Sequence, residues 1–322
     1  MKRLLLSSLA SRRVVCVLLT TLIHFGLAER VGAHPASGIL VDANGNVFFV
    51  YTGHGVMRVL PDGKIACIAP SKGGHWLCPD FAGSFSRTQP KYFARVTADG
   101  VKPGIIFADG GAPIAVCNDG NLYYASGVHG PDEPSPGGLT ISRMTPQGKI
   151  TQFALELPQK LSQLNEGITG LAAGADGSLF AALPSGVLKI AMNGEVSTVV
   201  HPVVIPNCDD DPPDHDASRH TPSLRGLAVD PKGVVFAPAT SCHRVIKITP
   251  DGAVSVVVTT ERPWSPTAVA LHDGALYILE YTNANGGANE DGGWVPRIRK
   301  LDRAGKLSKV AVIEPPAILR QP

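Results

Sequence analysis

Apolar and polar positions along this chain form a strand–turn–strand pattern that returns at regular intervals. Each copy has an apolar run, a turn that ends in glycine, and a second run rich in aromatic and β-branched residues. The clearest copies are Gly38–Val50, Ala115–Tyr124, Leu227–Phe236 and Val269–Ile278, with a shorter one at Gly174–Phe180. Apolar runs separated by Asn-Gly, Asp-Gly or Lys-Gly predict antiparallel hairpins, because glycine supplies the positive φ that these turns need.

Each copy is followed by a second hairpin with its own turn glycine. These second turns end at Gly63, Gly100, Gly148, Gly194, Gly252 and Gly305. Counting back from Gly100 by the usual offset reaches Gly83, which we interpret as the first turn of a degenerate second copy. The first-turn glycines are then Gly45, Gly83, Gly120, Gly177, Gly233 and Gly274.

Six repeats of a four-stranded unit of about 40–50 residues predict an all-β fold, a six-bladed β-propeller with four antiparallel strands per blade. A β-sandwich and a β-helix are the rival architectures, and the paired glycine turns of every repeat favour blades. The first copy starts close to the N-terminal segment, which leaves no earlier strand to join the last blade. Closure of the ring therefore depends on packing or on the tail at 314–322.

The N-terminus has the features of an export signal. Basic residues precede an apolar run from Val14 to Ala28, and a small-residue cleavage site follows at Val31–Ala33. This run is shorter than the roughly 20 residues that a membrane-spanning helix needs. We predict a signal peptide over residues 1–33, either secretory or of the twin-arginine type. A single domain then covers residues 34–322, in the periplasm or outside the cell and without a membrane span.

The charge of the expected mature chain excludes one class of partner. Of 29 basic and 27 acidic residues, five and one respectively lie in the signal, which leaves 24 and 26 and a net charge of −2. A nearly neutral chain without a basic stripe gives no electrostatic reason to bind nucleic acid. We expect a monomer that binds a small polar molecule.

Five cysteines remain after the signal is removed, and an exported protein can form disulfides. We predict the pairs Cys67–Cys78 and Cys208–Cys242, with Cys117 as a buried thiol. The alternative is that all five are unpaired small hydrophobic residues.

The long loops of the predicted propeller fall on one face. The first and second glycine turns of every copy lie on one side of the disc, which we call the turn face. All four long insertions lie on the opposite side, the loop face, in the third and sixth copies and between copies three, four and five. Functional residues concentrate on long loops of a rigid scaffold, so we expect the site on the loop face.

The inner strand of each blade starts nearest the axis, about eight residues before the first-turn glycine. These six mouth positions are Ser37, His75, Ala112, Thr169, Arg225 and Thr267. We predict that Arg225 orients an anionic or carbonyl-bearing substrate and that His75 acts as acid or base. Glu166, just before Thr169, is the candidate ligand of a divalent cation; alternatively it pairs with Arg225 across the mouth.

Further candidates lie in the loops of the same face. His54, His129 and His243 occupy equivalent positions in alternate copies, as a three-histidine metal site would require, although exposed loop histidines are common. We also assign them, with Trp294 at the end of the copy-six insertion, to substrate binding. The acidic insertion at 207–220 is either a cation site or a solvated loop held by Cys208.

The repeats resemble those of NHL-repeat proteins and of the gluconolactonase (senescence marker protein) family, most clearly over Gly38–Lys64. Ile141–Phe153 resembles the repeat of streptogramin lyases. The gluconolactonase resemblance implies a calcium site at the channel mouth and lactone hydrolysis. Glu166-Gly167 matches the Glu-Gly motif of that family, whereas Leu224-Arg225-Gly226 stands in place of its Pro-Asn-Gly ligand segment.

The two functional hypotheses come from different classes. The first is a hydrolase of a small lactone or ester that depends on a divalent cation, calcium rather than zinc. The second is a non-catalytic NHL-type propeller that binds a ligand or a protein on its loop face.

Overall fold

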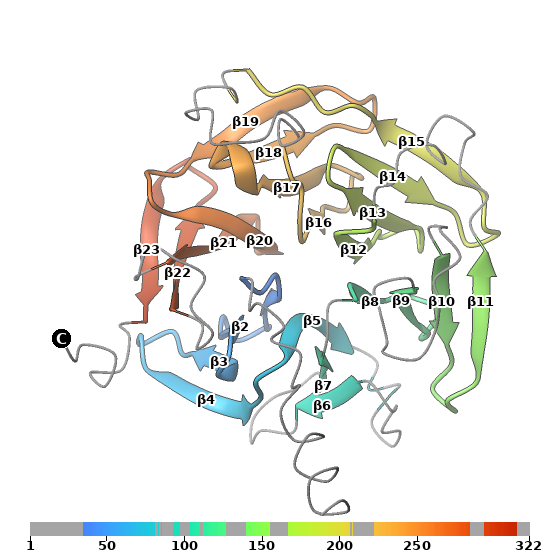
Figure 1. Cartoon of the computed structure of the whole chain (residues 1–322), viewed down its shortest axis with the longest axis horizontal. Coiled ribbons are helices and arrows are strands. Elements are labelled where there is room, and N and C mark those ends of the chain that lie inside the picture. Colours follow the sequence, from blue (N-terminus) through green and yellow to red (C-terminus); the bar gives the residue numbers. More distant parts are fainter. Residues whose placement is uncertain are drawn as a thin grey trace, which may run out of the picture.

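The computed structural model describes residues 35–80, 83, 85, 93–96, 104–109, 112–126, 140–154, 167–206, 208, 222–283 and 293–313. These residues form six antiparallel sheets arranged around a centre (Figure 1). Five sheets have four strands each, and the strands follow chain order from the centre outward. This arrangement defines a β-propeller with five four-stranded blades and a further sheet of three strands.

The first three sheets are built from strands β1 to β11, which are numbered in chain order. The first sheet contains β1 (Ile39–Val41), β2 (Val47–Tyr51), β3 (Gly55–Val59) and β4 (Ile65–Pro70). The second contains β5 (Gly74–Asp80), β6 (Phe93–Val96) and β7 (Gly104–Asp109). The third contains β8 (Ile114–Val116), β9 (Leu122–Ser126), β10 (Thr140–Met144) and β11 (Ile150–Ala154).

The remaining sheets follow the same plan. The fourth contains β12 (Gly170–Ala173), β13 (Leu179–Leu183), β14 (Gly186–Ile190) and β15 (Val196–Val200). The fifth contains β16 (Ala228–Val229), β17 (Val235–Ala239), the 3₁₀ turn η3 (Thr240–Cys242), β18 (Arg244–Ile248) and β19 (Val254–Thr259). The sixth contains β20 (Ser265–His272), β21 (Ala275–Asn283), β22 (Trp294–Leu301) and β23 (Leu307–Val312).

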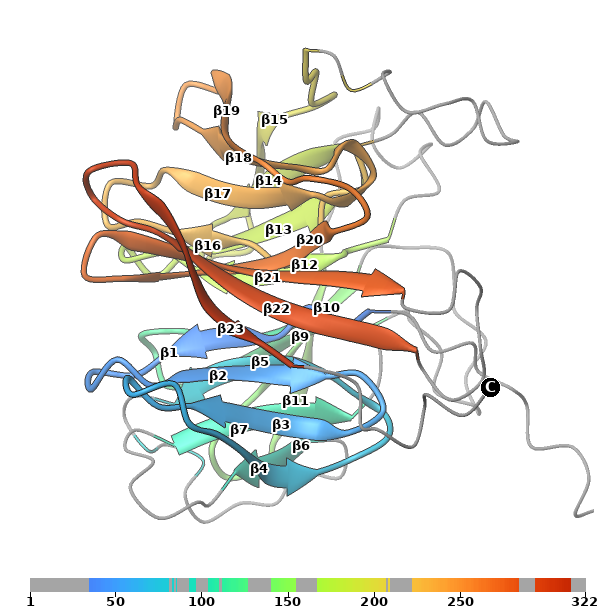
Figure 2. The same cartoon turned by 90° about the vertical axis from the view of Figure 1, so that its left-hand side faces the viewer.

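The glycine turns lie where the repeat predicts them. All six first-turn glycines have φ between 63° and 84°, and the five described second-turn glycines have φ between 80° and 88°. Only glycine adopts this region without steric cost, so the turns fix the spacing of the strands. Seen edge-on in Figure 2, the turns β20–β21 and β22–β23 lie together on one side of the disc, the turn face.

The second sheet departs from the predicted strand order. Gly83 does form the predicted turn, with its N–H bonded to the Asp80 carbonyl at 3.0 Å. The strand beside β5 is nevertheless β7, with β6 outside it, so the order is β5-β7-β6. The segment after Gly83 is polar, whereas residues 104–108 are apolar and buried and therefore suit the place beside the inner strand. The ring of Phe107 lies over Gly74, where a Cβ would be only 1.9 Å away.

A cross-strand pair repeats in every four-stranded sheet. The third residue after the first-turn glycine is aromatic, and it faces a lysine or arginine on the next strand. The pairs are Phe48–Arg58, Tyr123–Arg143, Phe180–Lys189, Phe236–Lys247 and Tyr277–Lys300. The ammonium lies 5.5 Å from the ring centre in the Phe180 pair and 5.2 Å in the Tyr277 pair, within cation–π range. These pairs let long cationic stems cover the rims of the aromatic rings, four of which are buried.

The first and last sheets close the ring by packing against each other. Inner strands contact all the way round the disc: β1–β5, β5–β8, β8–β12, β12–β16, β16–β20 and β20–β1. One apolar cluster joins Phe48, Phe49 and Val50 of the first sheet to Leu279 and Tyr281 of the sixth. No described sheet mixes strands from both ends of the chain. Packing is thus the mode of closure in the described residues, and the tail at 314–322 lies outside them.

Two hydrogen bonds support this closure from the sixth sheet. The Tyr281 hydroxyl donates to the Val50 carbonyl, and the Thr267 hydroxyl donates to the Ala36 carbonyl at 2.8 Å. Tyr281 is buried, and burial raises the pKa of its hydroxyl, which therefore stays a neutral donor at all ordinary pH values.

The cysteine predictions have mixed outcomes. Cys208 and Cys242 form a disulfide, as predicted, and Cys117 is a buried free thiol. The Cys67–Cys78 pair is wrong, since both residues are free. Cys67 is exposed on the outer strand β4, whereas Cys78 packs on the inner strand β5 against Ile106. No helix among the described residues is long and apolar enough to cross a membrane.

We predict that Tyr281→Phe lowers the free energy of unfolding by about 1–2 kcal/mol, because the buried Val50 carbonyl loses its donor. Urea unfolding measures the change. Tyr277→Phe is the matched control, since Tyr277 belongs to the same cluster and its hydroxyl has no hydrogen bond with a described residue. Equal losses in the two variants would contradict a special role of Tyr281 in closure.

Candidate functional site

The six mouth positions lie at the starts of the six inner strands. Hydrogen bonds between neighbouring sheets join several of them. The Ser37 N–H donates to the His75 carbonyl at 3.0 Å, and the Thr169 hydroxyl donates to the Leu224 carbonyl, beside Arg225, at 2.6 Å. The Thr267 hydroxyl donates to the carbonyl of Ala36, the residue before Ser37. The inner strands thus bring Ser37, His75, Thr169, Arg225 and Thr267 into one ring on the side opposite the turn face.

The centre of this ring is filled rather than hollow. A Cβ built on Gly226 would lie 2.8 Å from the Ser37 carbonyl oxygen and 3.3 Å from both Cζ3 of Trp76 and Cβ of Ala268. The Trp76 indole therefore reaches across the axis from the second sheet to the fifth, and it is only 7 % exposed. A ligand at the mouth would meet His75, which precedes Trp76 in the sequence, and Arg225, which precedes Gly226.

Arg225 brings a half-buried positive charge to the mouth. Its N–H donates to the Pro238 carbonyl at 3.2 Å, and Leu224 forms a β-bridge with Ala239, so the backbone at this point is fixed. Burial lowers the pKa of the Arg225 guanidinium to about 10, with Tyr281 acting in the opposite direction. The group remains a cation at neutral pH, in surroundings of low polarity where it attracts an anion more strongly than it would in water.

Ser37 and His75 lie beside each other at the same mouth. The Nδ1 of His75 lies 2.9 Å from the Gly73 carbonyl oxygen, which favours a proton on Nδ1 that is donated to this carbonyl. The Ser37 side chain is buried, and its Oγ has no hydrogen-bond partner among the described residues. Buried hydroxyls of this kind are uncommon, and the Ser37 hydroxyl has the capacity to bond a ligand at the mouth.

The two described loop histidines, His54 and His243, each contact residues near them and not each other. His54 stacks on Tyr51 with 4.1 Å between ring centres, and burial lowers its pKa. His243 has its Nδ1 2.7 Å from the Trp264 carbonyl and 3.3 Å from the Ser265 hydroxyl. The described part of the chain contains no group of three His, Cys, Asp or Glu side chains that could hold a metal.

The other predicted residues have separate positions. Trp294 begins β22 opposite Asn283 and packs against the cluster shared by the first and sixth sheets. His129 and Glu166 lie outside the described residues, as do the long insertions at 127–139, 155–166, 209–221 and 284–292. Their predicted roles in substrate and cation binding stay predictions.

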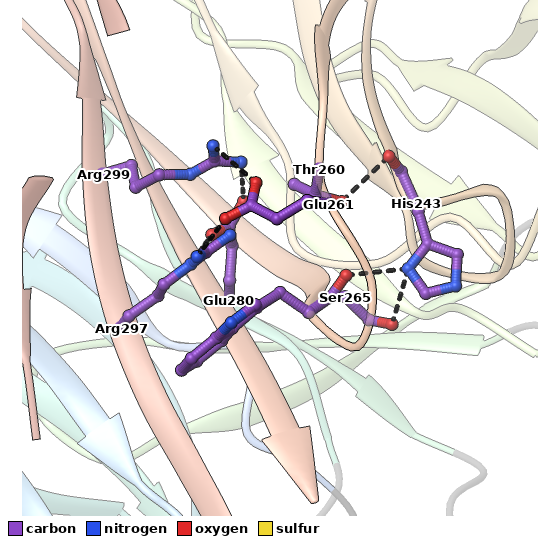
Figure 3. A network of polar contacts seen from close by, with 8 residues as sticks. His243, Thr260, Glu261, Ser265, Glu280, Arg297 and Arg299 are labelled. Carbon is purple, nitrogen blue, oxygen red and sulfur yellow. Dashed lines mark hydrogen bonds and ion pairs between the residues drawn. The ribbon is translucent and has the colours of Figure 1, made fainter. Parts of the chain in front are cut away.

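The sequence-based reasoning missed a polar network between the fifth and sixth sheets (Figure 3). Glu280 on β21 pairs with Arg297 and Arg299 on β22, and Glu261 from the β19–β20 connection reaches the same two arginines. The sequence does contain a signal for this network, the run Arg297-Ile298-Arg299, because alternate residues of a strand place both guanidinium groups on one side of the sheet. The run lies within a strand, whereas the search for site residues considered only loops and strand starts.

A groove on the turn face is a competing location. It has a volume of about 550 Å³ and lies between the first and sixth sheets, lined by Asn44, Pro61, His272, Lys300 and Lys309 among others. An equivalent groove of about 260 Å³ lies between the fourth and fifth sheets beside Phe180 and Lys189. Both follow from the repeated aromatic–cation pair, so we attribute them to blade packing rather than to a specific site.

The comparisons with known proteins agree with the fold. No family model matches the sequence, and no curated protein matches it. A luciferin-regenerating enzyme is similar in structure, with a TM-score of 0.52 and 13 % identity over 89 % of this chain and 97 % of that one. A gluconolactonase from Xanthomonas campestris has a TM-score of 0.50 and 14 % identity over 77 % and 84 % of the two chains.

A virginiamycin B lyase from Staphylococcus aureus is also similar, with a TM-score of 0.47 and 16 % identity over 89 % and 87 % of the two chains. At these identities the likeness extends to the fold alone. The class of protein is therefore a β-propeller, a fold that it shares with the luciferin-regenerating enzyme and the gluconolactonase.

We predict that Gly226→Ala lowers the free energy of unfolding by about 1–3 kcal/mol, because its Cβ would press on a backbone carbonyl that cannot easily move. Gly167→Ala is the matched control: a Cβ there meets nothing within 4 Å, and we expect a change within about 0.5 kcal/mol. Thermal and urea unfolding measure both. A neutral Gly226→Ala would mean that the centre of the ring is more loosely packed than these distances indicate.

Proposed function

We propose that this protein is a hydrolase of a small lactone or ester and that the mouth of the propeller on the loop face is its active site. The observation that carries the proposal is the buried Ser37 hydroxyl without a partner among the described residues, in the same ring as the Arg225 cation and the His75 imidazole. A hydrogen-bonding group, a cation and an imidazole that can act as acid or base are components that catalyse ester hydrolysis.

Each residue has a role in this proposal. Arg225 binds the carbonyl or carboxylate end of the substrate and stabilises the negative charge that develops on the carbonyl oxygen. His75 accepts a proton from the attacking water and returns it to the leaving alcohol, so that water is added across the ester bond. Ser37 orients the substrate by hydrogen bonding. His54, His129, His243 and Trp294 are proposed to contact the rest of a small polar substrate.

We further propose that Glu166 holds a divalent cation, calcium rather than zinc, because carboxylate oxygens are preferred ligands of calcium. Such a cation would polarise the substrate carbonyl. We also count the three-stranded sheet as the sixth blade of the propeller, and we retain an exported, monomeric protein with a signal at 1–33 as part of the proposal.

The second candidate function is a binding protein without catalysis. It is favoured by one specific observation: the Arg225 cation lies in surroundings of low polarity, in the same ring as the Ser37 hydroxyl. A cation and a hydrogen-bond donor are sufficient to bind an anionic ligand without any reaction. A turnover screen and elemental analysis separate these candidates.

Substitution of Arg225 tests the catalytic proposal. In a screen of lactones and esters we expect turnover by the wild type and a loss of about 10²–10³-fold in kcat/KM for Arg225→Met, because the developing oxyanion loses its partner. Lys64→Met, which removes an exposed cation on the turn face, is the control and should keep wild-type activity. Absence of turnover in the wild type over the whole screen would leave the binding protein as the better candidate.

Elemental analysis tests the cation proposal. We expect stoichiometric calcium in the purified wild type and its loss in Glu166→Ala, since the mutant lacks the proposed carboxylate ligand. Glu195→Ala, beside the second-turn glycine Gly194 on the turn face, should retain the metal. A metal-free wild type whose melting temperature does not rise with calcium or zinc would rule out a metal-dependent mechanism.

A further inference from the structure

The polar network between the fifth and sixth sheets is built around a fully buried carboxylate. Glu280 is 0 % exposed, and each of its carboxylate oxygens contacts one guanidinium, the Nε of Arg297 or the Nη2 of Arg299. Arg297 lies directly opposite Glu280 in the β21–β22 register, and Arg299 follows two residues later on the same side of the sheet. One carboxylate thus faces two cations.

The second cation is balanced by a carboxylate of a different kind. Glu261 comes from the connection between β19 and β20 and places Oε1 2.5 Å from Arg297 Nη1 and Oε2 3.3 Å from Arg299 Nη1. Its side chain is 61 % exposed, so it meets the arginines from the solvent side. The two guanidinium groups therefore present a forked surface on which a carboxylate already sits.

The arginines have more hydrogen-bonding capacity than the two glutamates use. Nη2 of Arg297 and Nε of Arg299 are buried and have no hydrogen-bond partner within the described residues. The Trp264 ring lies 4.2 Å from the centre of the Arg297 guanidinium and holds its plane in place. Planar forks of this kind match the geometry of a carboxylate.

We propose that Arg297 and Arg299 form a binding site for a carboxylate-bearing small molecule, and that Glu261 is a tethered competitor that the ligand displaces. This site is separate from the mouth and does not depend on the proposed hydrolase activity. The buried Glu280 sets the residual charge of the site at one positive unit, so a single carboxylate completes it.

The connection that carries Glu261 is anchored on both sides of it. Thr260 donates to the His243 carbonyl through its N–H at 2.8 Å and its hydroxyl at 2.9 Å (Figure 3). The Trp264 carbonyl lies 2.7 Å from Nδ1 of His243. Residues 261–263 between these anchors are exposed. Displacement of Glu261 therefore needs movement of its own side chain and a short exposed segment, while the sheets stay in place.

Glu261 remains a competitor over a wide pH range. Its hydrogen bond with Arg297 lowers the pKa of the Glu261 carboxyl to about 2, so the group is ionised whenever the protein is folded near neutral pH. A Glu261 that served only as a structural ion-pair partner would have the same lowered pKa. Binding measurements therefore distinguish a competitor from a structural partner.

Acetate is the probe, titrated at constant ionic strength against chloride and followed by melting temperature and tryptophan fluorescence. A tethered carboxylate acts at an effective concentration near the millimolar range, so we expect Glu261→Ala to bind acetate at least about 10-fold more tightly than the wild type does. Glu261→Gln, which keeps the length of the side chain, should also gain affinity and serves if the alanine variant is poorly folded. Trp264→Phe should abolish the fluorescence response.

Arg299→Lys in the Glu261→Ala background keeps a cation for Glu280 but removes the fork, and it should reverse the gain. The proposal is overturned if folded Glu261→Ala and Glu261→Gln bind acetate no better than the wild type. It is also overturned if the gain survives Arg299→Lys, because acetate would then bind elsewhere. Lactone and ester turnover at the mouth is unaffected by these results, so the two proposals fail independently.

Discussion

The structure depends on the contact between its first and last sheets. Because no described sheet shares strands from the two ends of the chain, the ring is held closed by side chains of β1 and β2 against those of β20 and β21. The two supporting hydrogen bonds end on the Ala36 and Val50 carbonyls. Ala36 immediately precedes the mouth residue Ser37, so closure and the geometry of the mouth are set by the same contacts.

Much of the fold could be predicted because glycine turns leave a local signal. Each turn needs a positive φ at one place, and the sequence shows glycine there without any knowledge of the neighbouring sheets. The strand order of the second sheet could not be read in this way, since it depends on whether the segment after Gly83 or the one at 104–108 fills a buried place. The Cys67–Cys78 pairing failed for a similar reason: an outer and an inner strand are close in sequence but not in space.

Counting back from the first-turn glycines could predict where the candidate site lies, but not the contacts of its side chains. The mouth positions follow from the start of each inner strand, and that count placed Ser37, His75 and Arg225 in one ring. Counting residues cannot predict that the Ser37 hydroxyl lacks a partner among the described residues, or that the Trp76 indole reaches across the axis, because both depend on how the sheets pack. The glutamate–arginine network has still less local signal, because Glu261 and Glu280 reach the same arginines from different elements. Low-identity fold neighbours with different named activities supply no substitute for such details.

The energetic cost of burying Arg297 and Arg299 indicates that they serve to bind a ligand rather than to stabilise the fold. Burying two guanidinium groups and a carboxylate costs more than burying apolar side chains of equal size, and ion pairs seldom recover that cost. Two buried donors that lack partners among the described residues add about 1–3 kcal/mol each. A sequence selected only for stability would place aliphatic residues on this side of β21 and β22, as it does at Leu276 and Ile278. The charges at 280, 297 and 299, in the middle of the β21–β22 pair, are therefore better explained by recognition of an anion in the place that Glu261 occupies.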